Sequence, residues 1–471
     1  MNTDHRGPNA LGIVSLVCLV IGNMIGAGVY ISSSYALDAL QDARLVLVAW
    51  AIGGLHAICG AIAYAALARR AALTGGEYVF LSRFVHPAVG FVAGWISIIA
   101  GFTAPIAAAG LVFGEYLVGA QQATAESRIA ATLLILASAL FHSINLRAGA
   151  WVNNAIVALK FLGFAVFAAS CYVFLRGIGL ESDFHPALDR PFIASDYWSR
   201  FGEAGFTNVF IIQLFFIVLA YTGFNASIYI AGEIDSKWVP LSMVLACVLV
   251  TGTYLGLNAL FLMCDTQSSI VQGRDYFVSG VAEHVGGPAL QWVMRITIAL
   301  SSATSVLAML ATGPRVVAQM ARDGWLPRFL VGTDSTGKPS TPRVAIVVQA
   351  VASCLIVWNA SLYQLTSYLG LTLTLCGAIA TSTLWLAYSE LNNRRKISWW
   401  EHLALAIYVA GALLLIATAW TIKQEQFWLC MATFASGVSI YLLAKLGKAN
   451  PKRDSLERAN LERDSGEGSV Q

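Results

Sequence analysis

The sequence predicts an all-α protein that crosses a membrane many times. Of its 471 residues 57% are hydrophobic and only 12% are charged, and the mean hydropathy is +0.68. A soluble protein of ordinary composition carries charge on about 25% of its residues. The apolar residues also gather into long runs, and a helix that spans a bilayer needs about 20 of them in succession. Composition and patterning together predict a polytopic helical membrane protein.

Twelve apolar runs are long enough to be membrane spans. They cover residues 11–36, 45–68, 86–118, 129–146, 151–175, 207–232, 238–263, 284–313, 342–360, 364–389, 401–421 and 426–445. The third and eighth runs exceed the thickness of a bilayer core. We therefore expect those two helices to tilt or to extend beyond the membrane.

The basic residues outside these runs predict the orientation. If the N-terminus lies in the cytoplasm, 20 of the 29 Lys and Arg residues fall on the inner side and 7 on the outer side. Cytoplasmic loops of membrane proteins are enriched in Lys and Arg. We therefore expect both termini inside, with a charged, disordered tail at 446–471. The short tails suit the cell (inner) membrane of a bacterium, and the net charge of +3 gives no reason to expect a nucleic-acid partner.

The first predicted span is interrupted in its middle. The stretch VIGNMIGAGVYISSS at 20–34 holds three glycines, and a glycine inside a helix costs up to about 1 kcal/mol relative to alanine. One interpretation is a close contact between helices, which small residues allow. The sixth span carries a similar interruption, YTGFNA at 221–226, at the matching place of a second half of the chain. Paired interruptions favour the other interpretation, a transporter site at two broken helices.

Broken helices at membrane depth expose backbone groups. Such irregular backbone is tolerated only where it is buried in protein or lines a cavity. Free N–H groups at a helix N-terminus bind anions, and free carbonyl groups bind cations. One break that offers donors and one that offers acceptors would suit a zwitterion.

Four motifs resemble those of the amino acid–polyamine–organocation (APC) superfamily. They are GNMIGAGVY in the first span, TGGEYVFLSR at 74–83, LAYTGFNASIYIAGEI in the sixth span and ATGPRVVAQMARDGWLP at 311–327. Their order and spacing agree with the family, and the resemblance covers roughly residues 10–445. It implies the LeuT-type fold, in which two inverted repeats of five helices, here 11–175 and 207–389, are followed by two helices within 390–445. The segment 176–206 then becomes an extracellular loop, and residues 1–10 become a cytoplasmic N-terminus.

The resemblance also implies how an amino acid would be held. Its carboxylate would meet N–H groups of the first break, those of Ile25, Gly26, Ala27 and Gly28. Its ammonium would meet carbonyl groups of the sixth span, those of Leu219, Ala220 and Thr222. Many relatives have an aromatic gate where this chain has Leu219. Two alternatives stay open: Tyr221 or Phe224 closes the site instead, or the gate is weaker. Asn225 matches the branch of the superfamily that contains the L-type and cationic/neutral exchangers.

Lys160 stands among Ala, Leu and Phe in the fifth span. A lysine at membrane depth is costly unless it is paired, neutral or able to reach the interface, and the last of these stays open. In sodium-independent members of the superfamily a lysine at this place resembles a built-in substitute for a sodium ion. The resemblance puts its ammonium against first-span carbonyls near Gly22 and against eighth-span hydroxyls. The stretch LSSATS offers four of them, Ser301, Ser302, Thr304 and Ser305, and Ser302 and Ser305 are the candidates. Removal from water favours the neutral form of a lysine, so Lys160 is the candidate proton-coupling residue, and a sodium site is disfavoured.

Other polar residues carry weaker signals. Glu77 follows a Gly-Gly turn beside basic residues, and an inner-gate ion pair and a solvated loop charge are both open interpretations. His56 in the second span is interpreted as a packed, hydrogen-bonded histidine, and Arg315 as a structural anchor. The eight cysteines include no CxxC pair, so we expect free thiols, no metal site and no cofactor. The nearly uncharged third span favours an apolar pocket and neutral substrates.

The sequence therefore predicts a secondary active transporter, not an enzyme. It would move neutral amino acids by alternating access, coupled to protons and independent of sodium. Its partners would be the amino acid, the proton and the lipid bilayer. Two alternatives stay open: an exchanger of amino acids or polyamines, and an amino-acid sensor that no longer transports. An exchanger of cationic cargo would need an acidic residue in the side-chain pocket, and we identify no convincing Asp or Glu at membrane depth in the sequence.

Overall fold

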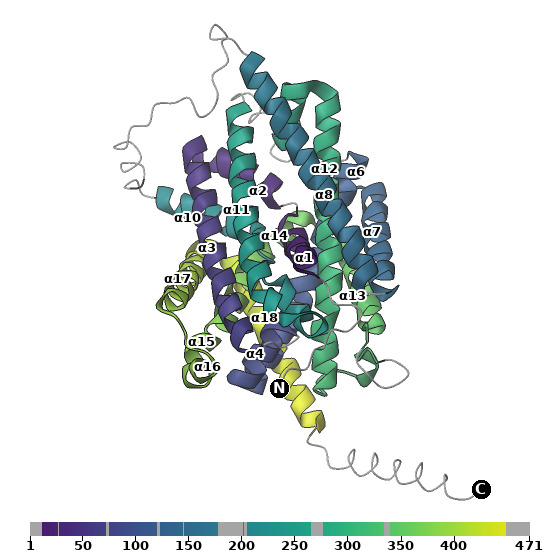
Figure 1. Cartoon of the computed structure of the whole chain (residues 1–471), viewed down its shortest axis with the longest axis vertical. Helices are drawn as coiled ribbons and strands as arrows, with labels where there is room; N and C mark the ends of the chain where they lie inside the picture. Colours follow the sequence, from purple (N-terminus) through teal and green to yellow (C-terminus); the bar gives the residue numbers. More distant parts are fainter. Residues whose placement is uncertain are drawn as a thin grey trace, which may run out of the picture.

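The structure is a computed structural model of the whole chain. It describes residues 12–448 apart from residues 27, 72–74, 120–122, 145, 178–200, 202–204, 265–276 and 334–339. Within these ranges it consists of helices and their connections and contains no β-strand. Most helices run along the long axis of the molecule and form one elongated bundle (Figure 1). The expected all-α architecture is confirmed.

The first part of the chain forms α1 (Ile13–Met24), α2 (Gly28–Leu40), α3 (Ala43–Arg70), α4 (Gly76–Phe84), α5 (Pro87–Ile96), η1 (Ser97–Thr103), α6 (Ala104–Val118), α7 (Ala125–Ile144) and α8 (Leu146–Gly177). The second part forms α10 (Phe206–Ala220), η2 (Ala226–Glu233), η3 (Ser236–Trp238), α11 (Val239–Cys264), α12 (Phe277–Arg322), η5 (Arg328–Leu330), α13 (Arg343–Asn359), α14 (Leu362–Thr381), α15 (Thr383–Leu386), α16 (Tyr388–Arg394), α17 (Trp399–Ile422) and α18 (Gln424–Lys448).

Nine helices in the described ranges are long and apolar enough to cross a membrane. A tenth span results if α1 and α2 count as one helix that is bent by 41°. Two further apolar helices, α10 and α13, have only 15 and 17 residues. The protein is therefore a multi-pass membrane protein, but the expectation of twelve full-length spans is met for nine. The sixth span is short because its α-helix ends at the break, at Ala220.

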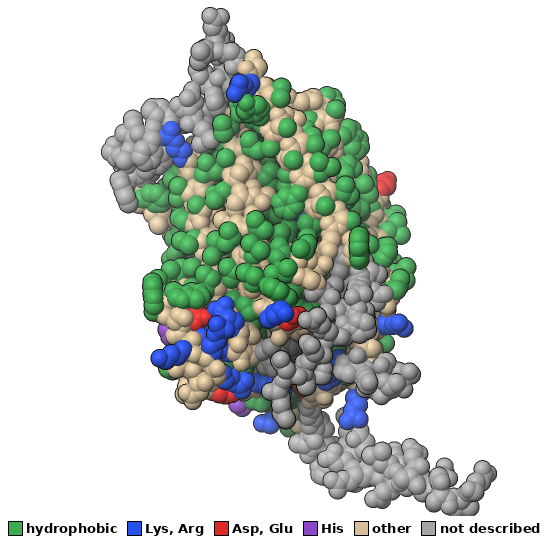
Figure 2. All heavy atoms as spheres, in the orientation of Figure 1, with side chains coloured by type: hydrophobic (Ala, Val, Ile, Leu, Met, Phe, Trp, Pro, Cys, Tyr) green, Lys and Arg blue, Asp and Glu red, His purple; other side chains and the backbone are tan. Residues whose placement is uncertain are grey.

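The surface carries a wide apolar band. Figure 2 shows hydrophobic side chains over the middle and upper parts of one face, whereas charged side chains gather below, at the end that carries α4, α15 and α16. Leu140, Trp151 and Val173 are 64%, 77% and 69% exposed. So much exposed apolar surface is unfavourable in water, whereas lipid tails are equally apolar. The band is therefore the lipid-facing surface, and we call the charged end the α4 end.

The two longest expected spans contain irregular turns. The third span consists of α5, the π-helix η1 and α6, and π-helical turns are frequent at functional sites. The eighth span was expected to begin at residue 284, but α12 begins at Phe277 and is kinked at Gly286 and Gly287. Gly287 adopts φ +66°, which glycine tolerates best, and Pro288 then starts the next helical turn.

The broken first span lies in the middle of the bundle (Figure 1). α1 packs against α8, α11 and α12, and α2 packs against α10 and α3. Val20, Ile21 and Met24 at the end of α1 are at most 4% exposed. The interruption between α1 and α2 is therefore surrounded by protein rather than by lipid, as irregular backbone at membrane depth requires.

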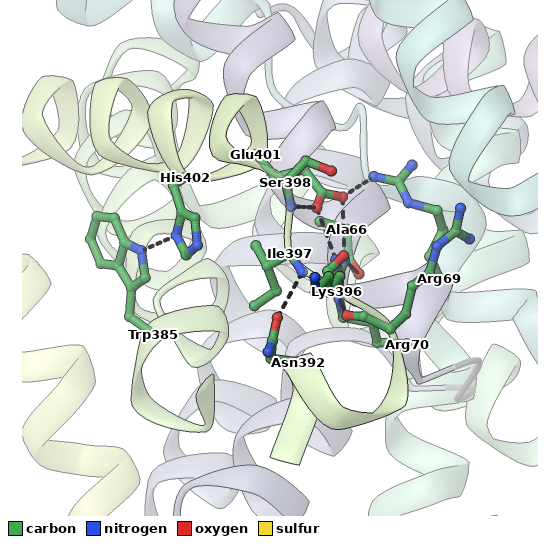
Figure 3. A network of polar contacts seen from close by, with 11 residues as sticks. Ala66, Arg69, Arg70, Trp385, Asn392, Lys396, Ile397, Ser398, Glu401 and His402 are labelled. Atoms are coloured by element: carbon green, nitrogen blue, oxygen red, sulfur yellow. Dashed lines mark hydrogen bonds and ion pairs between the residues drawn. The ribbon is translucent and has the colours of Figure 1, made fainter. Parts of the chain in front are cut away.

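An ionic network holds α3 to the start of α17 at the α4 end. Figure 3 shows the side chains of Arg69 and Arg70, from the last turn of α3, directed at Glu401 of α17, with nitrogen–oxygen distances of 2.5 and 2.9 Å. Glu401 Oε2 also accepts a 2.8 Å hydrogen bond from the N–H of Ser398 and thereby caps α17. Arg70 donates to three further carbonyl groups at 2.6–2.9 Å, those of Ala66, Arg395 and Lys396. This ionic network fixes the end of α3 to the start of α17.

Candidate binding site

The break in the first span is a point of close contact between two backbones. α1 ends at Met24, and α2 begins at Gly28. A Cβ atom on Gly26 would lie 2.8 Å from Ser305 Oγ, and one on Gly28 would lie 2.7 Å from Ala220 Cβ. The helix is therefore broken at this place, and the glycines let its neighbours approach.

The sixth span is broken at the predicted place. α10 ends at Ala220, residues 221–225 form turns, and the 3-10 helix η2 begins at Ala226. Gly223 adopts φ +97°, a left-handed conformation that favours glycine. Its carbonyl accepts a 3.1 Å hydrogen bond from Asn23 Nδ2. A side chain next to the first break thus joins the second break.

Tyr254 of α11 bridges the two breaks, a role that the sequence analysis did not assign. Its hydroxyl lies 2.9 Å from the Met24 carbonyl and 3.1 Å from the Ala220 carbonyl. These two carbonyls lie at the ends of α1 and α10, where helical partners are lacking. No charged residue stands near Tyr254 in the sequence to mark it, so only the fold reveals the contact.

Several backbone groups of the predicted amino-acid site are engaged within the protein. The N–H groups of Ile25 and Gly26 donate to the carbonyls of Ile21 and Met24 at 2.8 and 3.0 Å. The Leu219 carbonyl accepts from the N–H and the hydroxyl of Thr222, at 3.0 and 2.7 Å. Ala27 lies outside the described residues. An amino acid bound at the breaks would replace some of these internal hydrogen bonds with its own.

The two aromatic residues considered as gates lie in different places. The Tyr221 hydroxyl donates to the Trp50 carbonyl at 3.1 Å, and the side chain is fully buried between α3 and α11. Phe224 and Leu219 line a cavity beside the sixth-span break. Of the two aromatic rings, only that of Phe224 lines this cavity.

Lys160 of α8 reaches the first break. Its side chain is fully buried, and Nζ donates to the Ile25 carbonyl at 3.1 Å and to Thr304 Oγ1 at 2.9 Å. The ammonium therefore does not extend to the membrane interface. Of the two predicted hydroxyls, Ser305 donates instead to the Gly22 carbonyl at 3.0 Å, and Ser302 Oγ has no described partner. The structure brings Lys160 to the first span and α12 as expected, but through Thr304.

A cavity of about 110 Å³ lies beside the sixth-span break. Much of its wall is apolar and comes from Phe102, Pro105, Phe224, Leu369 and Leu373. One part is polar and comes from Tyr64, Glu77, Ser97, Asn225 and Tyr229. A water molecule needs roughly 10–15 Å³ of such space. The cavity is therefore large enough for several waters or for part of a small ligand.

Glu77 lies at the polar part of this cavity and is 5% exposed. Oε1 accepts from the Tyr64 hydroxyl at 2.9 Å and from Asn225 Nδ2 at 2.7 Å. Oε2 accepts from the Tyr229 hydroxyl and, at 3.5 Å, from Ser97 Oγ. The burial contradicts the interpretation of Glu77 as a solvated loop charge, and none of its partners in the described ranges is basic. The inner-gate ion pair is therefore absent among these residues.

Two glycines place Glu77 at the cavity. Gly75 and Gly76 both adopt positive φ, +115° and +59°, which turns the chain into α4. A Cβ atom on Gly76 would lie 2.1 Å from the ring of Tyr229, so only glycine fits there. The neighbouring Tyr78 anchors α4 through a 2.5 Å hydrogen bond to Asp323 Oδ2 beyond α12. Burial and the adjacent carboxylate raise the pKa of Tyr78, which stays a hydrogen-bond donor.

The remaining polar candidates, His56 and Arg315, make contacts within the protein. His56 Nε2 lies 3.1 Å from the Tyr408 carbonyl, and its ring packs against that of Tyr408, as interpreted from the sequence. Arg315 is buried and donates to the Ala311 carbonyl of its own helix. The described residues contain no group of three or more His, Cys, Asp or Glu side chains that could hold a metal ion.

Two broken helices are joined beside a cavity within a multi-pass helical bundle, and this arrangement defines the class of membrane protein. A family model described as amino acid permease matches residues 11–441. The protein belongs to this family, within the APC superfamily, and the resemblance found in the sequence is confirmed.

Curated relatives match over most of their length. The mouse b(0,+)-type amino acid transporter 1 is 23% identical over 443 residues, which cover 92% of this chain and 87% of the relative. The human large neutral amino acids transporter small subunit 2 is 22% identical over 457 residues, which cover 94% of this chain and 81% of the relative. Both alignments extend beyond the individual motifs to nearly the whole fold.

Proposed function

We propose that this protein is a secondary active transporter that carries amino acids across a membrane by alternating access. The observation that carries the proposal is the direct junction of the two breaks, through Asn23 and Tyr254, beside the cavity. Backbone groups at such breaks suit the carboxylate and ammonium of an amino acid. The family and the names of its relatives support the same cargo.

The proposed arrangement has twelve spans in two repeats of five, followed by two helices. The first repeat would be α1 with α2, α3, α5 with α6, α7 and α8. The second would be α10 with η2, α11, α12, α13 and α14. Helices α17 and α18 would complete the count, and the short α10 and α13 would span with the help of their neighbouring segments. Both termini would then lie in the cytoplasm at the inner membrane of a bacterium, on the side of the α4 end.

Lys160 is the proposed coupling residue. Its ammonium bridges the first break and α12, two elements that alternating access would move apart. Loss of its proton would weaken that bridge, which is how proton binding would favour one conformation. A sodium ion at the same carbonyl groups would be repelled by the ammonium, so transport would be independent of sodium.

Neutral amino acids are the proposed cargo of the apolar part of the cavity. Phe102, Pro105 and Leu373 line it, together with Leu369 and Phe224. Burial of an apolar side chain against such walls is favourable by about 25 cal/mol per Å². The name of the human relative, a large neutral amino acids transporter subunit, supports this choice.

Uptake of labelled neutral amino acids into proteoliposomes tests the proposal. Wild type should take up at least one of them, faster with an inward proton gradient and equally with or without sodium. Lys160→Ala should lose the response to the gradient, while Lys445→Ala, at an exposed residue of α18, should keep it. Uptake that requires internal amino acid and ignores the gradient would show exchange instead of proton coupling. Folded protein that carries no amino acid in either mode would contradict the proposed function.

A further inference from the structure

A second hollow, which we call the basic groove, lies beside the ionic network at the α4 end. It has a volume of about 580 Å³ and is formed by the end of α3, by η3 and the start of α11, and by the start of α17. Arg69, Lys237 and Arg395 line it, and among the described residues no Asp or Glu does. It shares no lining residue with the cavity beside the sixth-span break. The basic groove is therefore separate from the proposed amino-acid site.

The arginines of the basic groove are only partly neutralised by the protein. Arg69 and Arg70 share one carboxylate, that of Glu401, so the two arginines together keep a surplus positive charge. The Arg69 side chain is 21% exposed, whereas that of Arg70 is 1% exposed. The surplus charge is therefore accessible through Arg69. The Arg395 side chain is exposed and has no hydrogen-bond or ion-pair partner among the described residues.

Lys237 adds a third positive charge from η3. Its Nζ lies 2.7 Å from Asp235 Oδ2, but the two side chains are 60% and 42% exposed. Exposed pairs of this kind contribute roughly 0–1 kcal/mol, so a stronger anionic partner displaces them easily. The ammonium also lies 5.2 Å from the centre of the Trp238 ring, which leaves it at the surface. The basic groove therefore attracts a negatively charged ligand.

The wall of the basic groove reaches the lipid-facing surface. Leu241 is 47% exposed, and Ile62 and Val244 are partly buried, on two helices that pack against each other, α3 and α11. Trp400 is 43% exposed at the start of α17, with Arg69 Cζ 5.8 Å from the centre of its ring. Tryptophan is frequent where a membrane meets water. Figure 2 shows basic side chains directly below the apolar band, so charge and apolar surface adjoin here.

An anionic phospholipid satisfies both parts of the basic groove. A free anion would use the basic side chains and leave the apolar wall uncovered. A lipid without net charge would cover the wall and leave the surplus charge unbalanced. Guanidinium groups bind phosphate through paired hydrogen bonds, and basic pockets between membrane helices bind anionic lipid headgroups.

We propose that the basic groove is a binding site for an anionic phospholipid of the membrane leaflet at the α4 end. The phosphate and headgroup lie among Arg69, Lys237 and Arg395, and an acyl chain packs on Leu241 and Val244. The bound lipid joins α3, α11 and the start of α17, and so extends the ionic network around Glu401 to a third helix. This inference goes beyond the proposed function and does not depend on what the protein transports.

Native mass spectrometry of the purified protein in detergent tests the site. It counts the lipids bound during titration with phosphatidylglycerol or with phosphatidylcholine of the same acyl chains. Wild type should bind phosphatidylglycerol at least about tenfold more tightly, because the headgroup of phosphatidylcholine has no net charge. Lys237→Gln combined with Arg395→Gln should weaken phosphatidylglycerol binding by about 25-fold, a factor of about five for each basic side chain. Binding of phosphatidylcholine should stay unchanged.

Arg394→Gln is the matched control. Arg394 is next to Arg395 and half exposed, but it pairs with Glu390 and does not line the basic groove. This variant should keep the wild-type affinity for phosphatidylglycerol. Equal losses of affinity in Arg394→Gln and in the double variant would show that the lipid responds to the general charge of the α4 end and not to the basic groove.

Two further results would contradict the inference. Equal affinities of wild type for phosphatidylglycerol and phosphatidylcholine would show that the headgroup is not recognised, and this comparison needs no variant to fold. Inorganic phosphate that displaces phosphatidylglycerol at comparable concentrations would show that the basic groove binds a free anion and that the apolar wall has no part in binding.

Discussion

Glu401 and Glu77 are both buried carboxylates, 2% and 5% exposed, but their surroundings differ. Glu401 binds Arg69 and Arg70, so its charge is balanced inside the fold (Figure 3). Glu77 is held by two tyrosine hydroxyls, a serine and an amide, all neutral, beside the cavity. The first arrangement joins two helices, whereas the second leaves a carboxyl group beside the cavity with no basic partner among the described residues. Buried titratable groups in unusual surroundings of this kind are more frequent at functional sites than elsewhere in proteins.

The largest loss of stability is expected when Glu401 loses an arginine partner. Arg70→Ala removes the more buried arginine and three hydrogen bonds to carbonyl groups. The free energy of unfolding should fall by about 3–5 kcal/mol, because Glu401 then remains buried without its main partner. Thermal unfolding of the purified protein in detergent measures the change.

The control for that experiment is Arg394→Ala. Arg394 pairs with Glu390 at 2.8 Å, but both side chains are half exposed. Exposed ion pairs contribute roughly 0–1 kcal/mol, so the loss should be small. Comparable losses in Arg70→Ala and Arg394→Ala would contradict the structural role of the Glu401 network.

A medium loss of stability is expected at Gly76, whose backbone conformation places Glu77 at the cavity. Gly76→Ala puts a methyl group into the ring of Tyr229 at a residue with φ +59°. Overpacking should cost about 1–3 kcal/mol and should displace Glu77 from the cavity wall, so uptake of labelled neutral amino acids should fall as well. Gly252→Ala in α11 is the control, since a Cβ atom there meets nothing within 4 Å. Unchanged stability and uptake in Gly76→Ala would show that Tyr229 and Glu77 are not coupled in this way.

The smallest effect on stability is expected when Glu77 itself is replaced. Glu77→Gln keeps the size of the side chain and one oxygen acceptor, and the hydroxyls around it can accept from the new amide. The free energy of unfolding should change by about 1 kcal/mol. Glu401→Gln should cost several times more, because two arginines lose their charged partner. If thermal unfolding shows the two variants to be equally destabilised, the charge of Glu77 has a structural role.

Much of the architecture was predictable because it depends on local composition. Apolar runs of about 20 residues predict membrane helices, and nine are found among the described residues. The two breaks were also predictable, because Gly26, Gly28 and Gly223 interrupt apolar runs where glycine is costly. The lengths of the sixth and ninth helices and the kink at Gly287 were not predicted, since the exact ends of helices depend on their neighbours.

The site was predictable in part. Lys160 stood out because a lysine is costly in an apolar run, and the structure places it at the first break. Its hydroxyl partner was harder to choose, since Ser302, Thr304 and Ser305 follow one another within one helical turn. Only the rotation of α12 about its axis decides that Thr304 faces the ammonium.

The sequence by itself determined the family, the multi-pass class and the two broken spans, because these depend on motifs and hydropathy that neighbouring residues share. The tertiary structure alone decided what surrounds Glu77. Its partners Asn225 and Tyr229 are 148 and 152 residues away along the chain, and Asn23 meets Gly223 across 200 residues. Local patterns carry no information about such contacts, because they form only when the helices of the two halves pack together. A glutamate that resembles a loop charge in the sequence thereby becomes part of the central cavity.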